Sequence, residues 1–248
     1  MAGILFIISA PSGSGKSTLV NELRSNVKDL QFSVSFTTRP PRGSEQEGQA
    51  YHFVDRQQFE EMIAAGELLE HAEVFGNYYG TACGPLREAF AQGKDMLLDI
   101  DVQGAAQVRQ KMPEAVSIFV MPPTPEILER RLRNRSRAEG KVDEEVIARR
   151  LAKARQEIEN YHSYKYILVN DELNRAVEDL TAIVKAERYM REGRAEPGKA
   201  SAGVQRVLAL AAACRQQNAS ERLRPVLQAF GVPFSPDFAS SPAKNQLT

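Results

Sequence analysis

A lysine preceded by small residues lies near the start of the chain, in the segment 10–18 with the sequence APSGSGKST. The segment matches the G-x-x-x-x-G-K-[ST] pattern of a phosphate-binding loop, except that Ala10 stands where the first glycine is expected. Small residues let backbone N–H groups turn toward phosphate oxygens, the start of a helix adds partial positive charge, and Lys16 adds a full charge. The pattern therefore predicts a nucleoside triphosphate site with contacts from Ser12, Gly13, Ser14, Gly15, Lys16, Ser17 and Thr18.

An ordinary Gly/Ser turn ahead of an N-capped helix is the alternative interpretation of this segment. It accounts for Ser14 or Ser17, but it gives no reason for Lys16, because a cation in the first helical turn opposes the helix dipole. In the nucleotide interpretation, the hydroxyl of Ser17 is a ligand for Mg²⁺.

Two arginines three residues apart, Arg39 and Arg42, lie in a segment stiffened by two prolines. Guanidinium groups are suited to binding a phosphate monoester through paired hydrogen bonds. Tyr51 and Tyr79 are candidate hydroxyl donors to the same phosphate. Exposed arginines near prolines also occur on ordinary surfaces, so the residues alone leave both a phosphate clamp and a solvated loop open.

Two aspartates, Asp99 and Asp101, lie at the end of the apolar segment 96–100. The carboxyl ends of parallel strands form the edge at which α/β proteins bind their ligands, so charges at this position suggest a binding role. For Asp101, capping of a helix that begins near Gln103 is the alternative.

Four short apolar runs alternate with helical patterns along the chain. They are Ile4–Ser9, Met96–Ile100, Val116–Met121 and Tyr166–Val169. Helical patterns from Lys16 to Val27 and from Gln103 to Met112 follow the first two runs. Apolar strands that alternate with helices are typical of a parallel sheet buried on both faces. The sequence therefore predicts an α/β fold with a central parallel sheet.

We expect one domain over residues 1–193, and its core is expected in the segments 1–35, 90–128 and 156–193. Residues 36–89 have a different texture, with short alternating segments, turn residues and the aromatic stretch FGNYYG at 75–80. This composition favours a subdomain that is inserted into the core and holds the second substrate.

Residues 129–155 are rich in arginine and helical in pattern, with a polar break at 136–141. They suit a mobile lid over an anionic ligand, and a solvated charged helix is the alternative. Residues 194–248 are interpreted as a C-terminal extension. Within it, the spacing at 202–217 predicts an amphipathic helix, and the composition of 235–248 is typical of disorder.

The overall composition limits the possible partners and the compartment. The 248 residues include 32 basic and 32 acidic side chains, so no net charge favours binding to nucleic acid or a membrane surface. Cys83 and Cys214 are far apart and match neither a disulfide framework nor a zinc pattern. The apolar run after Met1 lacks the basic start of a signal peptide, so we interpret it as a buried strand of a cytoplasmic protein.

Three segments together resemble the signature blocks of guanylate kinases. They are Ser33–Arg42, Glu70–Thr81 and Leu98–Gly104, in that order and after the phosphate-binding loop. The resemblance covers about residues 3–190. It implies a P-loop three-layer fold with a GMP-binding insert and a helical lid, and an enzyme that phosphorylates GMP with ATP as co-substrate and Mg²⁺ as cofactor.

The resemblance also implies a role for individual residues. Those that match the family's GMP phosphate contacts are Arg39, Arg42, Tyr51 and Tyr79. Those that match its guanine contacts are Ser35, Glu70, Thr81 and Asp101. By the same resemblance, Asp99 lies near Mg²⁺ and the phosphates, Asn170 lies near the adenine, and the catalytic cations are Lys16, Arg131, Arg135 and Arg150. A carboxylate at position 70 is chemically suited to guanine, because guanine presents two adjacent N–H donors that one carboxylate can accept.

Two segments depart from the family's pattern. The lid turn at 134–141 is a few residues longer, so Arg135 and Arg137 could exchange roles. The sequence ACGP at 82–85 stands where a helix normally starts sooner, which leaves the contacts just after Thr81 open. Another nucleoside monophosphate kinase and a non-catalytic guanylate-kinase-like binding module are the rival hypotheses, and the choice between monomer and homo-oligomer stays open.

Overall fold

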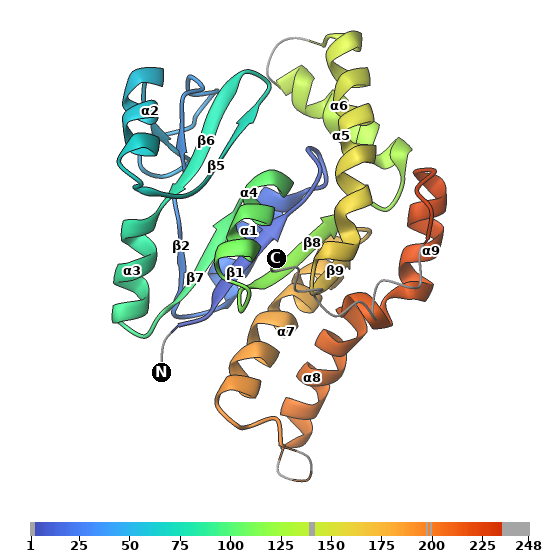
Figure 1. The fold of residues 1–248 in the computed structure, drawn as a ribbon. Coiled ribbons are helices and arrows are strands. Elements are labelled where there is room, and N and C mark those ends of the chain that lie inside the picture. Colours follow the sequence, from blue (N-terminus) through green and yellow to red (C-terminus); the bar gives the residue numbers. More distant parts are fainter. Residues whose placement is uncertain (1–2, 139–141, 197, 199, 235–248) are drawn as a thin grey trace, which may run out of the picture.

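The computed structural model describes residues 3–138, 142–196, 198 and 200–234 (Figure 1). The expectation of a disordered end at 235–248 lies outside the described residues. None of the helices that the structure describes has the length and apolar character needed to cross a bilayer.

The centre of the fold is a five-stranded parallel sheet with the order β2-β7-β1-β8-β9. Its strands are β1 (Leu5–Ser9), β2 (Leu30–Phe32), β7 (Asp95–Asp99), β8 (Val116–Met121) and β9 (Tyr166–Val169). Four of them are the predicted apolar runs, to within one residue at each end. The edge strand β2 was missed, because three residues are too few to give a pattern of their own.

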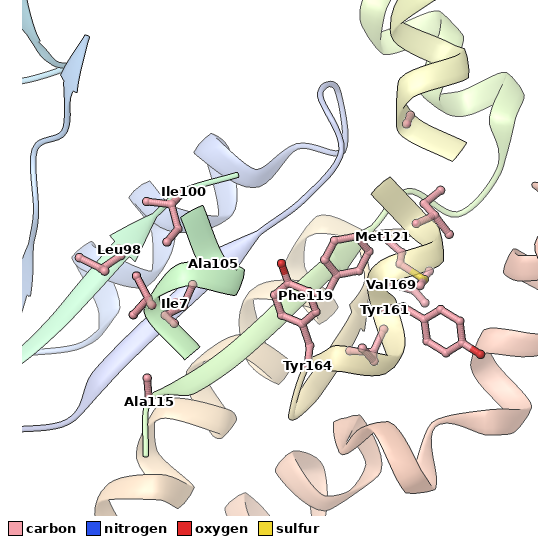
Figure 2. Close-up of a cluster of buried hydrophobic side chains, with 14 of the residues drawn as sticks. Ile7, Leu98, Ile100, Ala105, Ala115, Phe119, Met121, Tyr161, Tyr164 and Val169 are labelled. Carbon is pink, nitrogen blue, oxygen red and sulfur yellow. The ribbon is translucent and has the colours of Figure 1, made fainter. Parts of the chain in front are cut away.

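Helices cover both faces of this sheet, and the alternation of side chains along each strand divides the core into two clusters. On one face, Phe6 and Ile8 pack with residues of α1 (Lys16–Asn26) and α7 (Leu173–Arg191). On the other face, Leu5 and Ile7 pack with residues of α3 (Cys83–Ala91) and α4 (Val102–Lys111). Figure 2 shows this second cluster, in which Ile7, Leu98, Phe119 and Val169 project from neighbouring strands. Burial on both faces confirms the predicted α/β fold class.

A second, smaller sheet with the order β4-β3-β6-β5 is built from the segment between α1 and β7. Its strands are β3 (Phe36–Thr37), β4 (His52–Phe53), β5 (Leu68–Val74) and β6 (Asn77–Ala82), and α2 (Arg56–Ala64) lies beside them. Helix α3 begins at Cys83, directly after β6, so the segment ACGP does not delay the helix. Pro85 is accommodated because the first helical turn does not need its missing N–H.

Two further helix pairs flank the core. The first is α5 (Pro125–Ala138) with α6 (Glu144–Ile158), continued by the 3-10 turn η1 (Glu159–Ser163). The second belongs to the C-terminal extension and consists of α8 (Ala202–Cys214), η2 (Gln216–Asn218) and α9 (Ser220–Ala229). Figure 1 shows α8 beside α7 and α9 beside the lower part of the α5–α6 pair. The expected helix at 202–217 is therefore present, but it ends three residues early, where Arg215 turns extended.

Candidate active site

The predicted phosphate-binding loop connects β1 to α1, with its backbone turned by two glycines. Gly13 and Gly15 have φ angles of 89° and 87°, in the left-handed region that side chains disfavour. Helix α1 begins at Lys16 with no side-chain cap and no acidic residue in its first turn. The helix N-terminus therefore keeps its N–H groups and partial positive charge available to an anion, and Ser17 and Thr18 lie exposed in the same turn.

Lys16 forms an ion pair with Asp99 at the end of β7 and donates a hydrogen bond to the Ile100 carbonyl at 3.1 Å. Burial alone would lower the pKa of Lys16, but the adjacent Asp99 carboxylate raises it above its ordinary value. The lysine therefore stays charged, and its ammonium group is held at the carboxyl edge of the sheet.

Two of the predicted site residues, Asn170 and Arg131, donate hydrogen bonds to the backbone of the phosphate loop. The Asn170 side-chain amide donates to the Ser14 carbonyl at 2.7 Å, and Arg131 donates to the same carbonyl at 3.1 Å. Arg131 also donates to the backbone carbonyl of Asn170 at 3.1 Å. The arginine of α5 and the asparagine after β9 thus fix the shape of the loop between β1 and α1.

A buried carboxylate lies on the small sheet, opposite the phosphate loop. Glu70 of β5 is 3% exposed, and its Oε1 accepts a hydrogen bond of 2.6 Å from the hydroxyl of Thr81 on β6. The two residues are paired across the hairpin, after a shift of register between Leu68 and Glu70. This irregularity directs Glu70 and Thr81 to the same side of the hairpin.

The start of α4 closes the space behind this carboxylate. Asp101 is the N-cap of α4, and its Oδ1 accepts from the Gly104 backbone N–H at 2.9 Å. A Cβ atom on Gly104 would lie 2.1 Å from Glu70 Oε2, so only glycine leaves room for the carboxylate. The capping alternative for Asp101 is therefore observed, and the cap also brings Asp101 to the pocket of Glu70.

Burial raises the pKa of Glu70 to about 7, and the nearby charge of Asp101 acts in the same direction. The hydrogen bond from Thr81 and the cations of Lys111 and Lys16 oppose this shift but do not cancel it. A buried carboxylate that accepts from the hydroxyl of Thr81 is suited to a ligand that brings further N–H donors.

A third group contains the predicted phosphate clamp. Arg39 is 5% exposed, and its guanidinium carbon lies 5.3 Å from the centre of the Tyr51 ring. The rings of Tyr51 and Tyr79 meet edge to face at 5.8 Å. Burial raises the pKa of Tyr51, and the charge of Asp99 at the end of β7 adds to the shift. Arg39, Tyr51 and Tyr79 are thus brought together beside the phosphate loop.

Glu45 was missed by the sequence reasoning and shapes this clamp. It accepts two hydrogen bonds from Arg39 Nη2, at 3.0 and 2.9 Å, and one from the Arg42 backbone N–H at 2.8 Å. Arg39 Nε is buried without a hydrogen-bond partner among the described residues, and it is a donor that a phosphate oxygen can use. The only sign of this contact in the sequence was an acidic residue three positions after Arg42.

The arginines of the predicted lid lie on two helices. Arg135 and Arg137 are exposed near the end of α5, and Arg150 is half-buried on α6. Arg133, which the sequence reasoning did not select, joins the two helices through paired hydrogen bonds of 2.6 and 2.7 Å to Glu144. Its Nε also donates to Glu129 at 2.8 Å. The choice between Arg135 and Arg137 stays open, because both lie on the same exposed turn.

Comparison with known proteins agrees with this geometry. The Guanylate kinase family model matches residues 3–187. The chain is 54% identical to a guanylate kinase of Koribacter versatilis (strain Ellin345) over 93% of this chain and 97% of that protein. It is 51% identical to the guanylate kinase of Escherichia coli (strain K12) over 75% of this chain and 89% of that protein. The crystal structure of guanylate kinase from Anaplasma phagocytophilum aligns with a TM-score of 0.62 and 34% identity, covering 84% of this chain and 94% of that chain. The chain therefore belongs to the guanylate kinase family.

Proposed function

We propose that this chain transfers the γ-phosphoryl group of ATP to GMP and releases ADP and GDP, a step of purine nucleotide metabolism. The observation that carries the proposal is the combination of two sites at one edge of the sheet. A positively charged phosphate loop around Lys16 lies beside a site that contains the buried carboxylate of Glu70. The first site suits a triphosphate, and the second suits guanine.

Phosphoryl transfer requires that an oxygen of the GMP phosphate attacks the γ-phosphorus while the bond to the β–γ bridging oxygen breaks. The protein's part is to align the two nucleotides and to neutralise charge on the transferred group. In the proposed roles, Lys16 and the N–H groups of the loop bind the phosphates of ATP. Arg131, Arg135 and Arg150 of the lid neutralise the remaining charge, with Arg137 as the alternative to Arg135.

The acceptor is held by the small sheet. We assign the GMP phosphate to Arg39, Arg42, Tyr51 and Tyr79, and the guanine to Ser35, Glu70, Thr81 and Asp101. Glu70 accepts from N1–H and from the 2-amino group, whereas adenine would present a lone pair at N1 to the same carboxylate. Discrimination is strong in such a site because a buried carboxylate facing an acceptor is left without a partner.

The residues present fit a magnesium ion. Mg²⁺ prefers hard oxygen ligands and is usually held by one or two side chains together with substrate phosphates. The Ser17 hydroxyl, exposed in the first turn of α1, and the Asp99 carboxylate at the end of β7 are such ligands. When bound, Mg²⁺ withdraws charge from the phosphate oxygens. We propose these two residues as its protein ligands, partly through water.

The proposed function assigns a role to each part of the chain. We propose residues 1–35, 90–128 and 156–193 as the core, 36–89 as the GMP-binding insert, 129–155 as the lid, and 194–248 as a C-terminal extension. The free thiols of Cys83 and Cys214 suit the reducing cytoplasm, which is the compartment that we propose.

A coupled assay of ADP release tests the proposal directly. The purified protein is supplied with ATP, Mg²⁺ and one of four acceptors: GMP, AMP, UMP or dTMP. We expect turnover with GMP and a value of kcat/KM at least about a hundredfold lower with AMP, because the Glu70 site cannot pair with adenine. Equal turnover of AMP and GMP would contradict the assigned specificity, and no turnover of any acceptor would favour a binding module. A Lys16→Ala variant serves as the inactive control.

A further inference from the structure

Phe75 is the most exposed large hydrophobic side chain among the described residues, at 46%. It forms the turn of the β5–β6 hairpin with Gly76, and its φ angle is 52°. Left-handed backbone is uncommon for an aromatic residue, and Asn-Gly would suit this two-residue turn better. An exposed ring on a strained turn indicates that the ring has a role that is not served by folding of the hairpin.

The Phe75 ring contacts the lid. Lys153 Nζ lies 4.6 Å from the ring centre, and the guanidinium carbon of Arg149 lies 5.4 Å from it. Both distances are within the range of cation–π attraction. Arg149 and Lys153 are four residues apart on α6, so they lie one turn apart on the same helix face. Figure 1 shows the tip of the β5–β6 hairpin near α6.

The contacted face of α6 continues toward the nucleotide sites. Lys153 is paired with Glu157 at 3.7 Å, one turn further along the helix. Glu157 is buried, and it lies near enough to Lys16 and Asp101 for their charges to influence its pKa, which burial raises to about 7. The row 149, 153, 157 therefore runs from the Phe75 ring to the vicinity of the phosphate loop, and Arg150 lies beside its first member.

We infer that Phe75 is a positioning residue, which docks the tip of the GMP-binding hairpin on α6 and so places the lid arginine Arg150 when GMP draws the insert closed. The inference rests on the proposed function. Phe75 touches neither nucleotide in this scheme. Its effect is to couple the two substrates, because closing of the insert by GMP is transmitted to the helix that covers ATP.

The test uses two substitutions of Phe75 and one control substitution in the full-length protein. Phe75→Asn removes the ring but introduces a residue that favours the left-handed turn, so the hairpin is retained. Phe75→Tyr keeps the ring and should rescue the function. Tyr189→Leu is the matched control, because it removes another ring beneath an arginine, Arg194 at 4.3 Å, at the distant end of α7.

Two quantities are measured for each variant: kcat with its KM values, and the Kd of a non-hydrolysable ATP analogue with and without GMP. For Phe75→Asn we expect a loss of about 3- to 10-fold in kcat and in the factor by which GMP lowers the Kd of the ATP analogue. This is the size of effect expected for two weak cation–π contacts. The Kd for GMP alone should change less than about twofold, since Phe75 contacts no nucleotide. Phe75→Tyr and Tyr189→Leu should behave like the unmodified protein.

The inference is overturned if Phe75→Asn retains normal kcat and coupling, or if Tyr189→Leu loses as much as Phe75→Asn. A loss of GMP affinity in Phe75→Asn without a loss of coupling would also overturn it, because that result would make Phe75 a binding residue. Failure of the unmodified protein to phosphorylate GMP would instead contradict the proposed function, so the two failures are distinguished.

Discussion

Replacing Glu70 with glutamine tests whether the buried carboxylate selects guanine. The amide keeps the size of the side chain but offers one acceptor in place of two, and its NH₂ group faces a donor of guanine. Hydrogen bonds to a charged group contribute about 1.5–3 kcal/mol each, so the loss of one such bond and the mismatch of the other should lower kcat/KM for GMP by roughly 30- to 1000-fold. The KM for ATP should stay unchanged.

The raised pKa of Glu70 adds a pH signature. With a pKa of about 7 in the free protein, the carboxyl is about 9% ionised at pH 6 and about 91% at pH 8. GMP needs the ionised form, so its binding releases a proton below pH 7. From the carboxyl alone, the affinity for GMP should therefore rise about tenfold between pH 6 and pH 8 and level off above that.

The assay is isothermal titration with GMP at pH 6, 7 and 8, in buffers that differ in ionisation enthalpy, so that proton release is measured together with Kd. The GMP phosphate also titrates near pH 6. The pH dependence of GMP affinity that remains in the Glu70→Gln variant measures the contribution of this phosphate. Because Glu157 has a similarly raised pKa, Glu157→Gln is the control that should keep the slope. The reasoning is refuted if Glu70→Gln binds GMP with the slope of the unmodified protein.

Three further substitutions or deletions follow from the packing. Gly104→Ala would place a Cβ 2.1 Å from the carboxylate of Glu70, so the KM for GMP should rise at least about tenfold while the KM for ATP is kept; unchanged kinetics would contradict this contact. Gly15→Ala would strain a φ of 87° and meet the Asn170 amide at 2.4 Å, so urea unfolding should show a loss of about 2 kcal/mol or more. Truncation after Gly193 removes helices that pack on both core clusters, so the free energy of unfolding should fall by at least about 4 kcal/mol; an unchanged urea midpoint would show that the extension does not stabilise the domain.

The sequence was informative wherever a local pattern decides the structure. Strands such as Val116–Met121 are almost entirely apolar because both of their faces are buried, and this run coincides with β8. The loop before Lys16 was predicted from a local pattern as well, because small residues and a lysine at this spacing are typical of a phosphate-binding loop. Asp101 illustrates an intermediate case, in which capping of a helix and contact with the ligand were alternatives. The structure shows the cap, and the contact with guanine stays a prediction.

The features that were missed depend on contacts that no local pattern in the sequence reveals. Strand β2 is formed by pairing with β7, and Leu30–Phe32 alone is too short to indicate a strand. The partnership of Arg39 with Glu45 depends on how the proline-containing loop folds back. Among the arginines of α5 and α6, Arg133 is distinguished by its partner Glu144, which lies on the other helix of the pair. The contact of Phe75 with Lys153 likewise joins two parts of the chain that have no local relation.

The central claim is that one buried carboxylate reads the donor edge of guanine beside a cationic phosphate loop. A crystal structure with GMP bound tests it most directly, through the distances from the Glu70 carboxylate oxygens to guanine N1 and to the 2-amino nitrogen. We predict both at about 2.7–3.2 Å, with the GMP phosphate on Arg39. Guanine bound away from Glu70, with neither nitrogen within hydrogen-bonding distance of its carboxylate, would contradict the claim.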